Sequence, residues 1–133
     1  MGRVTRPLTG RTVLVVEDDA IVGYDLRVFL EDAGAEVLGP IGDVASACGV
    51  ARGQLIDGAV LDVRLWDETA APVAIELTAR HVPFIVVSAY GPRDVPPAMR
   101  EATYLAKPVR RLELVGVAAA MFARTRPARS AHR

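Results

Sequence analysis

Five short apolar runs alternate along the chain with segments of helical periodicity, and this alternation restricts the fold more than any other feature. Most of the runs are rich in Val, Leu and Ile, and Gly, Pro or charged residues bound them, as is typical of buried strands. They occupy residues 12–16, 36–39, 59–61, 83–87 and 103–106. Because strands and helices alternate throughout, we expect an α/β protein with a doubly wound parallel sheet and helices on both faces.

Four helices and one shorter helix are predicted between and after these strands. The first begins after Asp19, which can cap its first turn, and ends near Gly34. The other long helices are expected at residues 43–51, 70–80 and 110–124. Between the fourth and fifth strands, prolines at positions 92, 96 and 97 permit only a short helix at residues 97–101.

The composition indicates one domain with no overall electrostatic preference for a partner. The chain has 133 residues and a formal net charge of zero, so nothing global directs it to nucleic acid or to an anionic membrane. Its one cysteine, Cys48, excludes an intramolecular disulfide and favours a cytoplasmic location, and no apolar run reaches membrane-spanning length. We expect a flexible leader at residues 1–10, a folded domain at residues 11–124 and a flexible basic tail at residues 125–133.

Polar side chains follow four of the five predicted strands. Glu17 and Asp18 follow the first strand, Asp62 ends the third, Ser88 ends the fourth, and Lys107, the one lysine of the chain, follows the fifth. In a parallel sheet with right-handed crossovers, the carboxyl ends of all strands meet at one edge, where ligands bind. Each residue alone could be structural, but together they indicate a functional site.

The residue types at this edge suit phosphoryl chemistry. Three carboxylates close together repel one another, so a hard divalent cation is the expected neutraliser, and Mg²⁺ prefers such oxygen ligands. The absence of His or Cys from these turns argues against zinc. An Asp beside bound Mg²⁺, with a hydroxyl and an ammonium group facing it, is arranged to accept a phosphoryl group. We therefore expect Asp62 to be the acceptor.

The sequence resembles the receiver domains of bacterial two-component response regulators over residues 11–124. Four segments carry the resemblance: Val-Val-Glu-Asp-Asp at 15–19, Val-Leu-Asp at 60–62, Val-Val-Ser-Ala at 86–89, and Tyr-Leu-Ala-Lys-Pro at 104–108. The resemblance implies a flavodoxin-like fold with strand order 2-1-3-4-5, here with a shortened fourth helix. Within the family, the chain is similar to a subgroup of stand-alone, single-domain receivers from alphaproteobacteria.

The resemblance also implies a role for each site residue. It implies Asp62 as the phosphoacceptor; Glu17, Asp18, Asp62 and the backbone carbonyl of Arg64 as the Mg²⁺ site; Ser88, Ala89 and Lys107 as phosphate-binding residues; and Tyr104 as a switch aromatic. The residues two positions after Asp62 and after Ser88, Arg64 and Tyr90, would flank the path of the water that hydrolyses the phosphoryl group. Neither is an acid or an amide, so slow self-dephosphorylation is expected.

One segment departs from the family pattern. After Asp62, receivers usually have a Pro-Gly turn, whereas this chain has Arg-Leu-Trp-Asp-Glu at 64–68. The departure, together with the shortened fourth helix, questions whether the usual output face works in the usual way. The isomer of the Lys107–Pro108 peptide bond is not fixed by the sequence.

The leading hypothesis is a signalling domain, not an enzyme, that takes a phosphoryl group from a histidine kinase or phosphotransfer protein and then changes its protein contacts or acts as a phosphate sink. Two alternatives remain: a pseudo-receiver that binds partners without phosphorylation, and an Asp-nucleophile phosphotransfer hydrolase. The hydrolase generally needs a second acid at position 64, which is Arg, and is disfavoured.

The last helix is apolar all round from Leu114 to Ala123, which predicts contact with a partner or a second copy.

Overall fold

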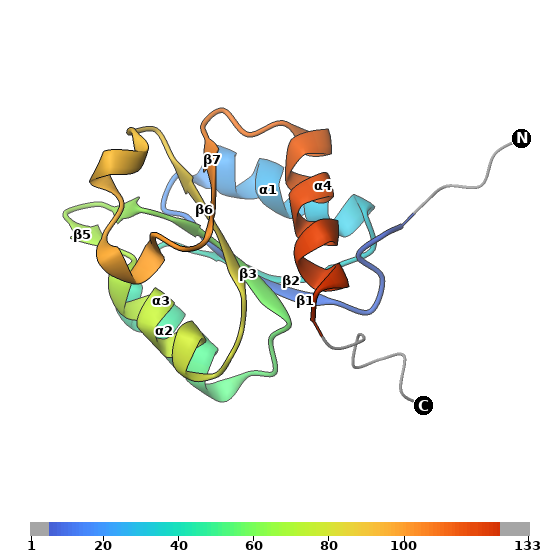
Figure 1. The fold of residues 1–133 in the computed structure, drawn as a ribbon, viewed down its shortest axis with the longest axis horizontal. Coiled ribbons are helices and arrows are strands. Elements are labelled where there is room, and N and C mark those ends of the chain that lie inside the picture. Colours follow the sequence, from blue (N-terminus) through green and yellow to red (C-terminus); the bar gives the residue numbers. More distant parts are fainter. Residues whose placement is uncertain (1–5, 126–133) are drawn as a thin grey trace, which may run out of the picture.

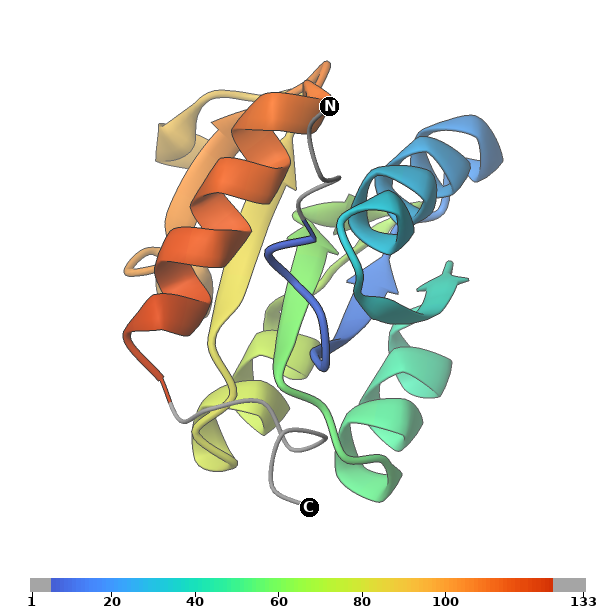
Figure 2. The same ribbon diagram turned by 90° about the vertical axis from the view of Figure 1, so that its right-hand side faces the viewer.

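The structure is a computed structural model, and it describes residues 6–125. A five-stranded parallel sheet forms the centre of the molecule, with strand order β2-β1-β3-β6-β7 (Figures 1 and 2). The strands are β1 (Thr12–Val16), β2 (Glu36–Ile41), β3 (Gly58–Asp62), β6 (Phe84–Ser88) and β7 (Thr103–Ala106). Since β6 and β7 are the fourth and fifth strands of this sheet, the predicted order 2-1-3-4-5 is confirmed.

Four α-helices cover the two faces of the sheet: α1 (Ala20–Asp32), α2 (Val44–Gly53), α3 (Ala71–Ala79) and α4 (Arg111–Ala123). Helices α2 and α3 lie on one face, and α1 and α4 lie on the other (Figures 1 and 2). The Asp19 side chain caps α1 by accepting hydrogen bonds from the backbone N–H groups of Ile21 and Val22, at 2.9 and 3.1 Å. This cap fixes the start of α1 directly after the acidic end of β1.

Two separate apolar clusters form the core because successive strand residues point to opposite faces. In β1, Leu14 and Val16 pack toward α2 and α3, whereas Val13 and Val15 pack toward α1 and α4. Both clusters are made of almost fully buried side chains. The unbroken apolar runs in the sequence therefore follow from a sheet that is covered on both faces.

The region between β6 and β7 contains no α-helix. It forms two 3₁₀ turns, η1 (Pro92–Asp94) and η2 (Pro97–Met99), instead of one helix. The prolines account for this because they remove backbone donors from the segment. The short helix predicted at residues 97–101 is thus a 3₁₀ turn that ends at Met99, whose buried side chain joins the core beside α3.

A small hairpin follows β3 and was not anticipated from the sequence. Strands β4 (Arg64–Leu65) and β5 (Glu68–Thr69) pair antiparallel, with Trp66 and Asp67 at the tip. Trp66 has a positive φ of 59°, whereas Leu65 is buried in the core. The departure from the family turn therefore has a defined structure of its own.

Residues 6–10, which the sequence analysis assigns to the leader, pack against the folded domain. The side chain of Leu8 is 0% exposed, and its backbone N–H donates to the carbonyl of Ala33 at 2.8 Å. The packed structure thus begins before residue 11. Residues 1–5 of the predicted leader and residues 126–133 of the predicted tail lie outside the described residues.

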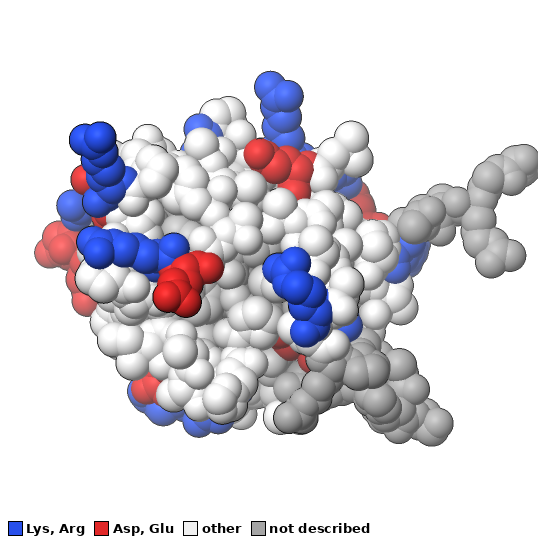
Figure 3. All heavy atoms as spheres, viewed as in Figure 1, with Lys and Arg blue, Asp and Glu red and all other residues white. Residues whose placement is uncertain are grey.

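The surface shown in Figure 3 carries charges of both signs. On the face seen in Figure 3, acidic and basic side chains are interspersed between wide uncharged areas. Across residues 6–125, every helix is too short or too polar to cross a membrane.

Replacing Leu8 by Ala tests whether residues 6–10 belong to the folded unit. Leu8→Ala should lower the free energy of unfolding by about 2–5 kcal/mol because it leaves a cavity in the apolar cluster between the sheet and helices α1 and α4, which we call the α1/α4 cluster. The matched control is Leu112→Ala, at a side chain that is 84% exposed, which should change stability by less than about 0.5 kcal/mol. Urea unfolding followed by circular dichroism measures both, and equal effects would show that Leu8 adds nothing to the core.

Candidate functional site

Three acidic side chains come together at the carboxyl end of the two central strands. Val16 of β1 pairs with Leu61 of β3, so the residues that follow lie side by side at the same edge. Glu17, Asp18 and Asp62 each place one carboxylate oxygen within 4.8 Å of the others. We call these three residues the acidic cluster. They are the acids that the sequence analysis selected.

Lys107 brings a positive charge to two members of the acidic cluster. Its Nζ atom lies 2.8 Å from Glu17 Oε1 and 2.9 Å from Asp62 Oδ2. The backbone N–H of Lys107 donates to the carbonyl of Ser88 at 2.9 Å, which fixes the lysine next to the end of β6. The Lys107–Pro108 peptide bond is cis. The fifth strand therefore delivers its ammonium group to the phosphoacceptor candidate.

Burial dominates the electrostatics of Glu17. The side chain is 3% exposed, and this desolvation raises the pKa of Glu17 to about 7, with a smaller rise from the negative charge of Asp62. Hydrogen bonds from Lys107 and from the backbone N–H of Asp19 act in the opposite direction. For Lys107, burial lowers the pKa, but the hydrogen bonds to Glu17 and Asp62 outweigh it, and the pKa is raised overall. Lys107 thus stays charged at neutral pH.

The donor set of the acidic cluster fits a hard divalent cation. Three carboxylates face one ammonium group, and Asp18 forms no ion pair within residues 6–125. All the candidate ligand atoms are carboxylate oxygens, and they lie within 4.8 Å of one another. Mg²⁺ binds such sites through one or two carboxylates and retains several waters. Glu17, Asp18 and Asp62 are therefore the residues that could hold it.

The predicted hydroxyl and aromatic residues form a chain of hydrogen bonds beside the cluster. Ser88 is buried at the end of β6, and its Oγ accepts from the backbone N–H of Tyr90 at 2.9 Å. The Tyr104 hydroxyl donates to the carbonyl of Tyr90. Ala89, the remaining residue of this predicted set, lies between Ser88 and Tyr90 in the same loop. Tyr90 is thus the link between Ser88 and Tyr104.

Arg64 lies in β4, the first strand of the hairpin that follows Asp62. Its guanidinium carbon is 5.9 Å from the centroid of the Tyr90 ring, which is within the range of a cation–π contact. The two residues that the sequence analysis placed beside the hydrolytic water therefore lie next to each other. Both side chains are exposed.

One site contact was missed by sequence reasoning. The backbone N–H of Trp66 donates to Asp18 Oδ2 at 2.8 Å, which joins the hairpin tip to the acidic cluster. The signal for it in the sequence was the one tryptophan of the chain, placed in a polar turn a few residues after Asp62. A backbone donor carries no side-chain signature, so the sequence could mark the turn but not the bond.

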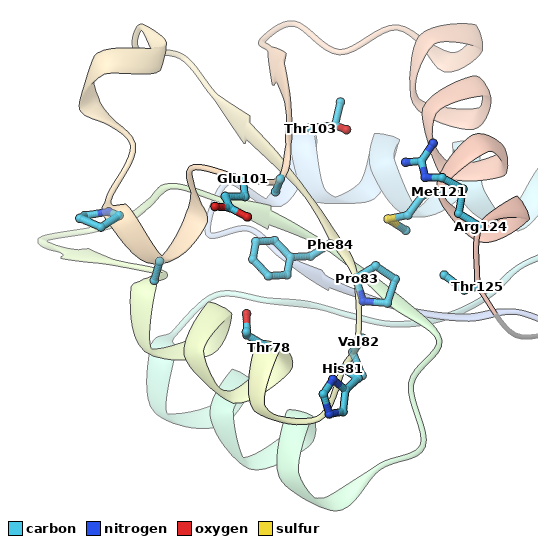
Figure 4. A pocket seen from close by; sticks show the side chains of 13 residues that line it. Thr78, His81, Val82, Pro83, Phe84, Glu101, Thr103, Met121, Arg124 and Thr125 are labelled. Carbon is cyan, nitrogen blue, oxygen red and sulfur yellow. The ribbon is translucent and has the colours of Figure 1, made fainter.

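A hollow of about 620 Å³ lies at the opposite edge of the sheet. It is lined by the end of α3, the starts of β6 and β7, and the end of α4, with Phe84 and Met121 beside Glu101 and Arg124 (Figure 4). None of the predicted site residues lines it. The acidic cluster and this hollow are therefore separate features.

Comparison with known proteins identifies relatives of this chain. No family model matches the chain. The chain is 31% identical over 102 residues to the transcriptional regulatory protein PdtaR of Mycobacterium tuberculosis, and the match covers 74% of this chain and 50% of that protein. The chain thus spans about half the length of the curated relatives it matches.

Two solved structures are similar over most of the chain. One is the receiver domain of a sensor histidine kinase from Pseudomonas aeruginosa, with a magnesium ion coordinated in its active-site cleft; it is 27% identical, the match covers 86% of this chain and 99% of that chain, and the TM-score is 0.74. The other is a putative response regulator from Chloroflexus aurantiacus. It is 28% identical, the match covers 86% of this chain and 98% of that chain, and the TM-score is 0.75.

This chain belongs to the response regulator receiver domains. Receiver domains are signalling domains of two-component systems, and their homologues are generally not enzymes. The similarity to an alphaproteobacterial subgroup stays a prediction.

The raised pKa of Glu17 predicts a pH-dependent cost to the stability of this receiver domain. In the unfolded chain Glu17 ionises near pH 4.5, whereas in the folded domain it ionises near pH 7, so the folded state loses relative stability as the pH rises between these values. Glu17→Gln removes the cost. It should raise the free energy of unfolding by about 3 kcal/mol at pH 8 and by little near pH 4.5.

Urea unfolding at several pH values, with a chelator present, measures this difference. Glu101→Gln serves as the control because Glu101 is exposed at the opposite edge of the sheet. If Glu17→Gln raised the free energy of unfolding by the same amount at every pH, the raised pKa of Glu17 would be contradicted.

Proposed function

We propose that this receiver domain accepts a phosphoryl group on Asp62. The observation that carries the proposal is the contact between Lys107 Nζ and Asp62 Oδ2, at 2.9 Å, next to two further carboxylates that fit a divalent cation. This arrangement offers one nucleophilic oxygen, one ammonium group and one cation site around the place where a phosphoryl group would be bound. Asp62 is 6% exposed, so the donor must reach into the site from the sheet edge.

The transfer is a direct substitution at phosphorus. A carboxylate oxygen of Asp62 forms a bond to phosphorus while the bond between phosphorus and the donor breaks, and the bonding electrons leave with the donor. Lys107, whose Nζ atom contacts Asp62 Oδ2, stabilises the negative charge of the phosphoryl oxygens. Glu17, Asp18, Asp62 and the backbone carbonyl of Arg64 would hold Mg²⁺. The bound ion would further stabilise the negative charge of the phosphoryl group.

The response to phosphorylation would pass through Ser88. A phosphoryl oxygen on Asp62 would accept a hydrogen bond from the Ser88 hydroxyl group, whose Oγ also accepts one from the backbone N–H of Tyr90, and Ala89 offers a backbone N–H beside it. Tyr90 in turn holds the hydroxyl of Tyr104 through its carbonyl. Rearrangement of Ser88 therefore alters the contacts of both tyrosines, and we propose Tyr104 as the switch aromatic.

The proposed donor is a histidine kinase or a phosphotransfer protein in the cytoplasm. The proposed result is a change in protein contacts, or storage of the phosphoryl group as a phosphate sink. A second copy could bind through α4, where Leu112 and Gly116 are exposed on an apolar helix.

Two other functions make different predictions from the same site. A pseudo-receiver would bind its partners without taking phosphate. An Asp-nucleophile hydrolase would turn phosphate esters over, but it needs an acid near the nucleophile where this chain has Arg64, whose guanidinium faces Tyr90. The pair of contacts made by Lys107 favours the phosphoacceptor over both.

Incubation with acetyl phosphate and Mg²⁺ tests the proposal directly. The wild-type protein should take one phosphoryl group, detected by intact mass or by a phosphate-binding gel, and removal of Mg²⁺ with a chelator should prevent it. Asp62→Asn should not be labelled, whereas Asp67→Asn, at an exposed aspartate of the hairpin, should be labelled like wild type. An unlabelled wild type would favour the pseudo-receiver, and continuous release of phosphate would favour the hydrolase.

The phosphoryl group on Asp62 should be lost slowly. Arg64 and Tyr90 cannot activate water as an acid or amide could, and the Arg64 guanidinium contacts the Tyr90 ring. Arg64→Asn should shorten the lifetime by about tenfold because its amide can orient water. Arg80→Asn, at an exposed position at the opposite edge, is the control. A wild-type lifetime of seconds in purified protein would contradict the expectation.

A further inference from the structure

The β4–β5 hairpin has little stabilising structure of its own. Each of its strands has two residues, which is too short for an isolated hairpin to be stable in water. The base is closed by a hydrogen bond from the Ala70 N–H to the carbonyl of Val63, at 2.9 Å, and Leu65 is anchored in the core. The conformation of the tip must therefore depend on contacts outside the hairpin.

Trp66 occupies an unfavourable conformation at this tip. Its φ of 59° lies in the left-handed region, which is costly for a bulky residue, and its side chain is 81% exposed. Burial of the indole ring therefore does not compensate for the backbone conformation. Within residues 6–125, the hydrogen bond from its N–H to Asp18 Oδ2 is the one hydrogen bond that joins the tip to the rest of the domain.

Asp18 is both the acceptor of this bond and a member of the acidic cluster. Lys107 pairs with Glu17 and Asp62 but not with Asp18. The Trp66 N–H dipole is thus the hydrogen-bond donor that faces the Asp18 carboxylate within the described residues. Any cation held by the cluster acts on the same carboxylate that positions the hairpin tip.

A second contact joins the hairpin to the other side of the site. The guanidinium of Arg64 lies over the ring of Tyr90, and the N–H of Tyr90 donates to Ser88 Oγ. The hairpin is therefore held between the acids at the end of β1 and the hydroxyl at the end of β6. A change at Asp18 reaches the hairpin through one contact, and a change at Ser88 reaches it through two, by way of Tyr90.

We propose that the Asp18–Trp66 hydrogen bond couples the hairpin to divalent-cation binding, so that a bound cation fixes the tip in the conformation seen here. A cation held by the acidic cluster restricts the Asp18 carboxylate to one orientation, and the restricted carboxylate in turn restricts Trp66. Coupling is reciprocal, so a partner that binds the ordered hairpin also raises the affinity of the cluster for the cation. The inference rests on the proposed function only in requiring a cation at the cluster.

Trp66 provides the measurement, because it is the one tryptophan of the chain. The 133-residue protein, freed of metal with a chelator, is titrated with MgCl₂ while tryptophan emission is recorded, and calorimetry follows binding independently. Emission should change in a saturable way with the calorimetric midpoint. Exchange of the Trp66 amide hydrogen should slow by about fivefold or more on Mg²⁺ binding, the lower end of typical coupling between two sites.

Two controls locate the effect. The amide of Leu8, bound to the carbonyl of Ala33 at the opposite edge, should exchange at the same rate with and without Mg²⁺. Asp18→Asn should lose the change in emission, whereas Asp67→Asn should keep it, since Asp67 lies at the same tip and makes no hydrogen bond or ion pair inside residues 6–125.

The outcomes separate the coupling from the proposed function. Mg²⁺ binding by calorimetry with unchanged emission and unchanged Trp66 exchange overturns the coupling and leaves the cation site intact. Faster exchange of the Trp66 amide also overturns it, because the cation would then displace the N–H from Asp18. If calorimetry detects no Mg²⁺ binding, the coupling fails together with the cation site of the proposed function.

Discussion

The contact of one ammonium group with two buried carboxylates determines much of this domain. Burying Glu17 and Asp62 is unfavourable unless a positive charge accompanies them, and Lys107 supplies it at 2.8 and 2.9 Å. This requirement fixes the end of β7 relative to β1 and β3, and it leaves Asp18 as the member of the acidic cluster that forms no ion pair within the described residues. The candidate cation site and the position of the proposed acceptor oxygen both follow from that one arrangement.

Much of the fold could be predicted because its signals are local. The apolar runs at 12–16 and 83–87 are unbroken because α-helices cover both sheet faces, and Asp19 marks the start of α1 because its side chain caps the first turn. The juxtaposition of Glu17, Asp62 and Lys107 could be predicted for a different reason. A parallel sheet brings the ends of all its strands to one edge, so their position in the sequence was sufficient.

The rest depends on interactions between distant segments. Leu8 has no periodic neighbours, and its place in the core is decided by the carbonyl of Ala33 and by the α1/α4 cluster. The hairpin tip depends on a backbone N–H, which every residue except proline has, so nothing in the side chain of Trp66 identified its partner. The prolines between β6 and β7 predicted a short helix, but the division into two 3₁₀ turns required the packing of Met99.

The positions of the charged groups in the sheet affect how the domain can open. Glu17 follows β1 and Asp62 ends β3, and both of these strands lie in the interior of the sheet. Lys107 follows β7, which is an edge strand. Edge strands are the ones that open first in local unfolding, since they are paired on one side only. If β7 detached, the buried acids would lose their counter-charge while still excluded from water. The ion pairs of the site therefore act against fraying of this edge, and they add to the backbone pairing that holds the four-residue strand β7 to β6.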